Sequence, residues 1–246
     1  MKAEKIKYAM KSESGALTAE GALVYDETIS RKRPAVLVAP NWMGMTEQAI
    51  ERGKLVAGSR YIVLVADMYG QGTRPADFGQ AAALANPLRE NAVEQRSRIR
   101  AAYDAMIAEG TKRNLTDGRR AAIGFCFGGG NVLELARDGA DIAAAVSIHG
   151  DLKTAQAAKK GAIKAKLLVT HGAPDPVAPK ADRDAFEAEM DAAGAKWQML
   201  LFSGILHAYT DQGFDVPGIA GWDEPATRQT YVATHQFIAD AFAGRL

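Results

Sequence analysis

The fold of this chain is decided by the stretch Ala121-Ala122-Ile123-Gly124-Phe125-Cys126-Phe127-Gly128-Gly129-Gly130. An apolar run leads directly into Gly-x-Cys-x-Gly, the nucleophile-elbow pattern Gly-x-Ser-x-Gly with a thiol in place of the hydroxyl. Such an elbow is a sharp turn from a strand into a helix, and it presents the central side chain above the edge of a sheet. Small residues flank that side chain because the strand and helix backbones pass close together. The stretch therefore predicts a strand, a tight turn and a helix, with Cys126 at the turn.

Cys126 is the one cysteine of the chain. Residues 129–137 read as a helix with a glycine-rich start, so the thiol lies near the positive end of a helix macrodipole, which favours negative charge on sulfur. A lone cysteine is also commonly a small buried hydrophobe. Residues elsewhere in the chain have to distinguish these two interpretations.

A nucleophile needs a base, and the base needs a carboxylate that orients it. In α/β-hydrolases these groups follow the nucleophile in the order acid, then histidine, each in a loop after a strand. Asp175 follows the apolar run 166–170, and His207 follows the run 197–202. Both loops emerge at the edge where ligands bind in open α/β sheets. Asp175 alone could be a turn residue between prolines, and His207 alone a loop histidine without a task. Their order and shared edge instead predict a triad with Cys126.

Three other histidines compete for the role of base. His149 ends the run 143–148, so it also lies near the active edge, and His171 ends the strand before the Asp175 loop. We expect both to be satisfied by backbone groups at strand ends. His235 falls in the final helix and is expected to be structural.

The composition sets the class of protein. The chain has 246 residues, of which 48% are hydrophobic, enough to bury a sizeable core as one domain spanning residues 1–246. Lys and Arg total 30 and Asp and Glu total 29, so no overall field attracts nucleic acid or an anionic membrane. We expect neither partner, and either a monomer or a homodimer.

The N-terminal residues 1–7 are charged and lack the apolar core of a signal peptide, and no run is long enough to span a membrane. One unpaired cysteine suits a reducing compartment. These features predict a cytoplasmic protein. No group of His, Cys and Asp has the spacing of metal ligands, so we expect no metal and no cofactor.

Strand and helix patterns alternate along the chain, which predicts an α/β fold with a mostly parallel, doubly wound sheet of about eight strands flanked by helices. The later strands are continuously apolar, as expected when helices cover both faces. The expected strands are 5–10, 21–25, 35–39, 61–66, 121–125, 143–148, 166–170 and 197–202, and the expected helices are 47–59, 88–109, 129–137, 181–193 and 225–242.

Residues 70–87 fit neither pattern. They contain glycine, proline and alanine without clear periodicity. Long loops in compact domains are often functional. The segment is therefore a candidate cap over the active site, or simply a long connection.

Several motifs together resemble the dienelactone hydrolase family. They are residues 124–130, 147–150, 171–176 and 207–210, with supporting matches at 66–70 and 186–190, and the likeness runs from about residue 35 to the C-terminus. The resemblance implies an α/β-hydrolase fold, hydrolysis of lactones or esters, and a triad of Cys126, Asp175 and His207. It also implies that the backbone N–H groups of Trp42 and Phe127 form the oxyanion hole.

The chain departs from that family at two places. Asn41 stands immediately before Trp42, where the family usually has a Glu that is thought to interact with the resting thiol. Residues 211–213 are Asp-Gln-Gly, where relatives that bind a dienelactone carboxylate offer Arg. The resemblance therefore does not extend to dienelactone itself as a secure substrate. The candidate substrate-binding residues are Asn41, Arg89, Arg98 and Tyr209, with Arg74 and Arg96 as further candidates for holding a carboxylate.

The sequence thus predicts a hydrolase that cleaves a small-molecule lactone, activated ester or thioester through a thioester acyl-enzyme on Cys126. A thiolate leaves a tetrahedral intermediate more readily than a simple alkoxide, so turnover favours substrates with stabilised leaving groups. The alternatives on the same scaffold are a non-catalytic binding protein and a redox-sensing thiol protein. The intact triad residues disfavour the first, and the absence of a resolving cysteine or a C-x-x-C motif disfavours the second.

Overall fold

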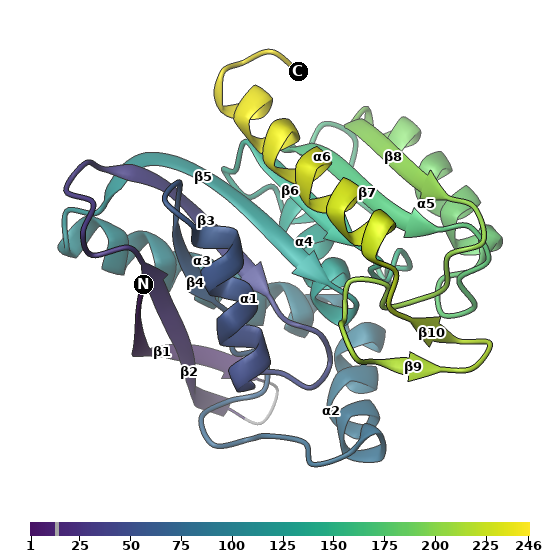
Figure 1. Cartoon of the computed structure of the whole chain (residues 1–246), viewed down its shortest axis with the longest axis horizontal. Helices are drawn as coiled ribbons and strands as arrows, with labels where there is room; N and C mark the ends of the chain where they lie inside the picture. The colour runs from purple at the N-terminus through teal and green to yellow at the C-terminus, as the bar shows by residue number, and fades with distance from the viewer. Residues whose placement is uncertain (13–14) are drawn as a thin grey trace.

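The computed structural model describes residues 1–12 and 15–246, and its centre is an eight-stranded sheet (Figure 1). The strands at one edge pair in antiparallel fashion, β1 with β2 and β2 with β4, whereas every neighbouring pair from β4 to β8 is parallel. In spatial order the strands are β1 (Lys2–Ser12), β2 (Gly15–Tyr25), β4 (Ile62–Val65), β3 (Arg33–Ala39), β5 (Thr116–Phe125), β6 (Ala144–Ile148), β7 (Lys166–Gly172) and β8 (Lys196–Phe202).

Helices cover both faces of this sheet, as the alternating pattern predicted. Figure 1 shows α1 and α6 in front of the strands and α3 to α5 behind them. No helix within residues 1–12 and 15–246 combines the length and the apolar composition that crossing a membrane requires. The helices are α1 (Glu47–Ala57), α2 (Phe78–Glu90), α3 (Ala92–Lys112), α4 (Phe127–Arg137), α5 (Lys180–Ala193) and α6 (Glu224–Phe242).

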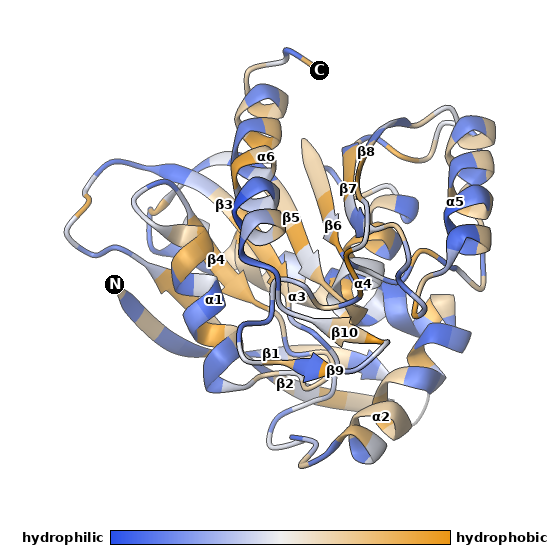
Figure 2. Ribbon diagram, turned by 45° about the vertical axis from the view of Figure 1, so that its right-hand side comes forward, coloured by the Kyte–Doolittle hydropathy of each residue, from blue (hydrophilic) through white to orange (hydrophobic). Residues whose placement is uncertain are grey.

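Two apolar cores lie on the two faces of the sheet. One forms where α1 and α6 pack on the strands, around side chains such as Val56 and Ile238. The other forms under α2 to α5, around side chains such as Met106 and Phe186. Figure 2 shows the matching pattern, with the central strands largely hydrophobic and the helices alternating between hydrophobic and hydrophilic residues. Each fully buried aliphatic side chain contributes about 1.5–3 kcal/mol to the free energy of folding.

The central strands confirm the predicted burial, and the edge strand does not. Every residue of β3 and β4 is buried, because both faces of these strands are covered. In β8 no residue is fully buried, although the run 197–202 was expected to be covered like the others. The reason is its position, since β8 is the last strand of the sheet and has a neighbour on one side only.

Residues 70–87 contain a helix that the sequence pattern did not predict. Helix α2 begins after Asp77, whose side chain accepts a hydrogen bond from the backbone N–H of Gln80 at 2.8 Å. The predicted helix 88–109 is in fact the end of α2 followed by α3. The two helices separate at Asn91, whose side chain caps α3 by accepting from the N–H of Glu94.

A short hairpin, β9 (Asp215–Val216) with β10 (Ala220–Gly221), was also not predicted. Together with α2 it lies at the end of the sheet to which the parallel strands point (Figure 1). These are the additions that surround the loops carrying the candidate site residues.

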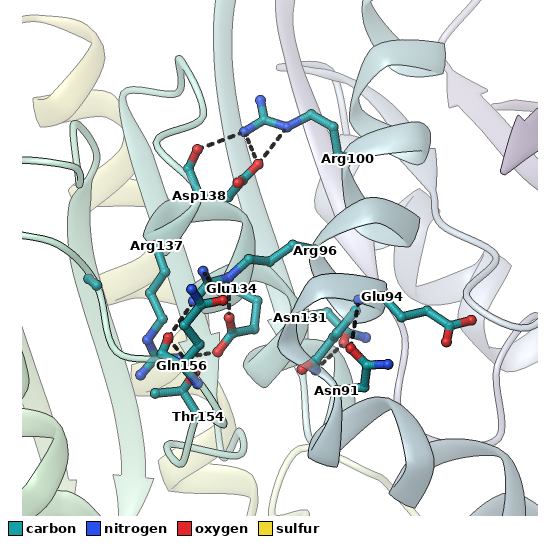
Figure 3. A network of polar contacts seen from close by, with 12 residues as sticks. Asn91, Glu94, Arg96, Arg100, Asn131, Glu134, Arg137, Asp138, Thr154 and Gln156 are labelled. Atoms are coloured by element: carbon teal, nitrogen blue, oxygen red, sulfur yellow. Dashed lines mark hydrogen bonds and ion pairs between the residues drawn. The ribbon is translucent and has the colours of Figure 1, made fainter. Parts of the chain in front are cut away.

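A buried polar network fixes α4 against its neighbours (Figure 3). Arg137, whose side chain is fully buried, bonds to Glu134 at 2.9 Å and to Glu189 of α5 at 2.8 Å. From α3, Arg96 reaches Glu134 at 2.7 Å, and Arg100 reaches the more exposed Asp138 at 2.6 Å. Removing one partner of a buried ion pair such as Arg137–Glu134 costs about 3–5 kcal/mol. The helix that starts at the predicted nucleophile is therefore held rigidly.

Candidate active site

Cys126 lies at the turn between β5 and α4, with backbone angles φ 53° and ψ −122°. This is a conformation that non-glycine residues rarely adopt, and it persists only where the surroundings impose it. The flanking glycines show what imposes it. A Cβ on Gly124 would lie 1.9 Å from the carbonyl oxygen of Gly128, and a Cβ on Gly128 would lie 2.0 Å from that of Ala39. The turn predicted from the sequence is therefore present, and it requires glycine at both positions.

The structure brings the three predicted triad residues together. His207 Nε2 lies 3.2 Å from Cys126 Sγ, and His207 Nδ1 lies 2.8 Å from Asp175 Oδ2. All three side chains are buried. Because Asp175 accepts the proton of Nδ1, it fixes the orientation of the ring and leaves Nε2 facing the sulfur.

The backbone holds both loops in place. Asp175 Oδ1 accepts from the backbone N–H of Val177 at 2.8 Å. The N–H of His207 donates to the carbonyl of Ile219 at 3.1 Å, and the N–H of Gly221 donates to the carbonyl of His207 at 3.1 Å. The β9–β10 hairpin thus positions the histidine of the candidate triad.

Charges inside the triad favour a protonated imidazole. Burial alone would lower the pKa of His207, but Cys126 and the hydrogen-bonded Asp175 raise it well above the ordinary value of 6.5. Burial would likewise raise the pKa of Asp175, and the bond from His207 keeps it below its ordinary value instead. An ionised carboxylate and a protonated ring next to sulfur are what a thiolate nucleophile requires.

The predicted oxyanion donors, Trp42 and Phe127, are both connected to Tyr69. The Tyr69 hydroxyl donates to the carbonyl of Trp42 at 2.8 Å, and its ring stacks on that of Phe127 with centroids 5.9 Å apart. Phe127 is the first residue of α4, so its N–H is one of the helix N–H groups without a partner inside the helix. Tyr69 therefore contacts both residues whose N–H groups are the predicted oxyanion donors, through the carbonyl of Trp42 and the side chain of Phe127.

A cavity of about 520 Å³ opens beside Cys126 and His207. Most of its lining is apolar. Trp42 and Phe78 stack with centroids 5.6 Å apart, and Phe214 meets Phe78 edge-on at 5.7 Å. Phe78 is the first residue of α2, so part of the segment proposed as a cap contributes to the wall of this cavity.

Comparison with known proteins agrees with this geometry. The family model described as "Dienelactone hydrolase family" matches residues 21–242. The chain belongs to the dienelactone hydrolase family. The α/β-hydrolase fold predicted from the sequence is therefore confirmed.

Similar proteins extend over nearly the whole chain. A solved structure named m3DLH is 31% identical, covers 98% of both chains and has a TM-score of 0.88. The crystal structure of a dienelactone hydrolase-like promiscuous phosphotriesterase from metagenomic libraries is also 31% identical over 98% of both chains, with a TM-score of 0.86. An uncharacterised protein of Caenorhabditis elegans is 33% identical over 128 residues, which are 50% of this chain and 80% of that protein.

Position 41 of this dienelactone hydrolase family member belongs to a buried polar cluster. Asn41 Nδ2 donates to Asp211 Oδ2 at 3.1 Å, and Arg52 pairs with Asp211 Oδ1 at 2.8 Å. The Arg52 guanidinium also lies 4.4 Å from the centroid of the Phe125 ring. Burial would raise the pKa of Asp211, but Arg52 keeps it below its ordinary value. The sequence showed Asp211 as a departure from the family, but it did not predict Arg52 as its partner. No motif around Arg52 indicates such a role.

The two other strand-end histidines have different partners. His171 Nε2 bonds to the carbonyl of Ala178 at 3.0 Å, in agreement with the expected backbone partner. For the side chain of His149 that expectation is wrong, because its Nε2 bonds to the Thr210 hydroxyl at 2.8 Å. The His149 ring is fully buried and meets the His207 ring edge-on at 5.2 Å. Burial lowers the pKa of His149 to about 3, so this ring is neutral.

The candidate substrate-binding residues separate into two groups. Asn41 and Arg89 line the cavity, and Arg89 is paired with Asp151 at 2.7 Å. Tyr209 does not line it. Its side chain is fully buried, and its hydroxyl bonds to Thr170 and Thr230 at 2.9 Å, on the side of the core under α6.

Three arginines considered for a substrate carboxylate also point elsewhere. Arg98 bonds to Glu94 and, at 2.8 Å, to the carbonyl of Met68. Arg96 belongs to the α3–α4 network, and Arg74 donates to the carbonyl of Thr73 at 2.7 Å. None of the three lines the cavity among the described residues. Each of these arginines instead bonds to an acceptor within the protein that lies closer to it than the cavity does.

Proposed function

We propose that this chain hydrolyses small carboxylic esters, lactones or activated thioesters through an acyl-enzyme on Cys126. One observation carries the proposal. A continuous chain of hydrogen bonds, at 3.2 and 2.8 Å, runs from the sulfur of an elbow residue through His207 to the buried carboxylate of Asp175. Membership of the dienelactone hydrolase family supports the same reaction class.

In the first half of the reaction, His207 holds the thiol proton and the sulfur of Cys126 attacks the carbonyl carbon. The carbonyl electron pair moves to oxygen, and the backbone N–H groups of Trp42 and Phe127 stabilise the oxyanion. As the carbonyl re-forms, the bond to the leaving group breaks, and the leaving group takes the proton from His207. The product is a thioester between the acyl group and Cys126.

In the second half, His207 takes a proton from water, whose oxygen attacks the thioester carbon. Collapse of this intermediate breaks the carbon–sulfur bond and releases the acid. The proton that His207 took from water is then shared between His207 and the Cys126 sulfur, which restores the resting state. Asp175 keeps the ring in the correct tautomer through both halves. Because thiolate is a good leaving group, productive acylation favours aryl esters, enol lactones and thioesters over alkyl esters.

A second candidate class follows from one similar structure. The metagenomic protein that is 31% identical to this chain is described as a dienelactone hydrolase-like promiscuous phosphotriesterase. The corresponding step here is attack of the Cys126 sulfur on phosphorus, departure of an aryl alcohol that takes the His207 proton, and hydrolysis of the phosphorus–sulfur bond by water.

The test is a hydrolysis screen with purified protein and a Cys126→Ala control. The substrates are phenyl acetate, S-phenyl thioacetate, dihydrocoumarin and a diethyl aryl phosphate, with ethyl acetate as the unactivated comparison. We expect turnover of the activated acyl substrates, slow or no turnover of ethyl acetate, and an acetyl group on Cys126 in mass spectra of quenched mixtures. Equal activity of Cys126→Ala, or no turnover of any substrate, would reject the proposal and favour a binding or redox role.

A further inference from the structure

Apart from the triad, the described residues that line the cavity beside Cys126 include two charged side chains, Arg89 and Asp211, and each is neutralised by a partner. Arg89 lies 2.7 Å from Asp151 through Nε, and its Nη1 donates to Asn86 Oδ1 at 2.9 Å. Its guanidinium also lies 5.2 Å from the centroid of the Phe127 ring. Two of its nitrogens therefore already bond within the protein, and the Asp151 carboxylate balances its positive charge.

The second charge is Asp211, which Arg52 neutralises at 2.8 Å. Both side chains are about nine-tenths buried, with exposed fractions of 8% and 10%. Asn41 adds a hydrogen bond to the same carboxylate at 3.1 Å. Asp211 therefore presents neither a free negative charge nor a free acceptor pair to a ligand.

The triad adds one negative charge. Asp175 is ionised, and whichever of Cys126 and His207 holds their shared proton, that pair is neutral overall. The two ion pairs contribute nothing, so the site as a whole carries a charge of about −1. A substrate carboxylate would enter a mostly apolar cavity in which no described lining residue offers an unpaired positive charge, and it would meet some repulsion.

What the cavity offers instead is an aromatic wall, formed by Trp42, Phe78 and Phe214 from three separate segments. Phe78 is 49% exposed although it stacks on Trp42, and Ile219, also in the lining, is 47% exposed. Large apolar side chains that remain this exposed beside a nucleophile provide a surface on which a flat ligand can stack.

From these contacts we propose that the site selects uncharged esters bearing a flat apolar group, which stacks on the aromatic wall. This inference rests on the proposed ester hydrolysis and adds the class of substrate. This preference differs from that of an enzyme for anionic lactones, because the arginine that lines the cavity, Arg89, already pairs with Asp151 within the protein.

The test compares substrates that differ by one carboxylate. 4-Ethylphenyl acetate is paired with 4-(carboxymethyl)phenyl acetate, and phenyl hexanoate with monophenyl adipate, so that both sides of the scissile bond are covered. We expect kcat/KM to be about tenfold or more higher for the neutral member of each pair. Equal values, or a preference for the anionic members, would overturn the inference while leaving ester hydrolysis established. No turnover of either member would instead reject the proposed function.

The aromatic wall is tested with Phe78→Ala and Phe214→Ala, and Leu55→Ala, which is 71% exposed on α1, is the matched surface control. Each wall variant should raise KM for 4-ethylphenyl acetate by about two- to tenfold. KM for vinyl acetate, a neutral activated ester without a ring, should stay within twofold. Equal losses on both esters would mean a general structural effect and would contradict stacking.

Charge pairing is tested with Asp151→Asn, which releases Arg89. The ratio of kcat/KM for the anionic ester to that for its neutral partner should rise by about threefold or more. An unchanged ratio would show that Asp151 does not neutralise Arg89 and would refute this step of the inference.

Discussion

Replacing Tyr69 by Phe removes one oxygen atom and tests the predicted oxyanion hole directly. The hydroxyl donates to the carbonyl of Trp42 at 2.8 Å, and Tyr69 is only 4% exposed. Losing such a bond costs about 1 kcal/mol, with up to about 3 kcal/mol where the acceptor stays buried and unpaired. The carbonyl of Trp42 belongs to the peptide unit that joins Trp42 to Met43, and the Trp42 N–H, the proposed oxyanion donor, belongs to the preceding peptide unit. Loss of the hydrogen bond should therefore let the Trp42 backbone shift and displace this N–H.

The expected kinetic effect follows from what the donor contributes. Complete loss of one oxyanion donor lowers kcat by about 10²–10³. A donor that is displaced but not removed loses only part of this stabilisation of the oxyanion. Tyr69→Phe should therefore lower kcat about tenfold, equivalent to about 1.4 kcal/mol, with KM nearly unchanged. Steady-state kinetics on phenyl acetate provide the assay.

Tyr103 supplies a matched control. Its hydroxyl donates to the carbonyl of Asp141, also at 2.8 Å, and it is 3% exposed, but it lies on α3 away from the cavity. Tyr103→Phe should lose a similar free energy of unfolding, about 1 kcal/mol in urea denaturation, with no change in kcat. If both variants lose stability and neither loses rate, Tyr69 does not position the oxyanion hole and the role given to Trp42 is wrong.

Three further predictions concern the groups around the triad. His207→Ala should lower kcat by several orders of magnitude and His149→Ala by far less, because only His207 contacts sulfur; the reverse ranking in steady-state assays would move the base. The pKa of His149 is about 3, so the folded state takes up no proton there between pH 6.5 and 3, whereas the unfolded chain does. The contribution of His149 to the free energy of unfolding should therefore fall by up to about 1.4 kcal/mol per pH unit in that window, and urea denaturation of His149→Gln should show a shallower slope. Asn41→Asp places a second carboxylate beside Asp211, so it should destabilise the protein by about 3 kcal/mol at pH 7 and recover stability toward pH 4, where one carboxyl is protonated; a pH-independent difference would exclude this contact.

The elements that the sequence predicted are those with a local cause. The elbow at residues 121–130 follows from apolar strand residues and from glycines that leave no room for a Cβ. Asp175 and His207 could be placed because each ends a strand, and parallel strands end at one edge. Helix α2 gave no such signal. Its alanines carry no clear periodicity, and Pro87 in its last turn resembles a break, although Asp77, which caps its start, is a residue type that favours helix N-caps.

The surroundings of the thiol could not be predicted for a different reason. Asn41, Arg52 and Asp211 meet from segments up to 170 residues apart, so no local pattern links them. Likewise, His149 and His207 both follow strands at the same edge. Only tertiary packing decides that one faces sulfur and the other faces Thr210.

The backbone at Cys126 has a consequence for anyone who evolves this protein in the laboratory. A residue with a side chain in that conformation costs about 1–3 kcal/mol relative to glycine, which adopts positive φ freely. Selection for heat resistance alone would therefore favour Cys126→Gly, a change that removes the nucleophile. Libraries built from this chain should be sorted for turnover and for thermal tolerance in the same round, because at this one position the two selections oppose each other.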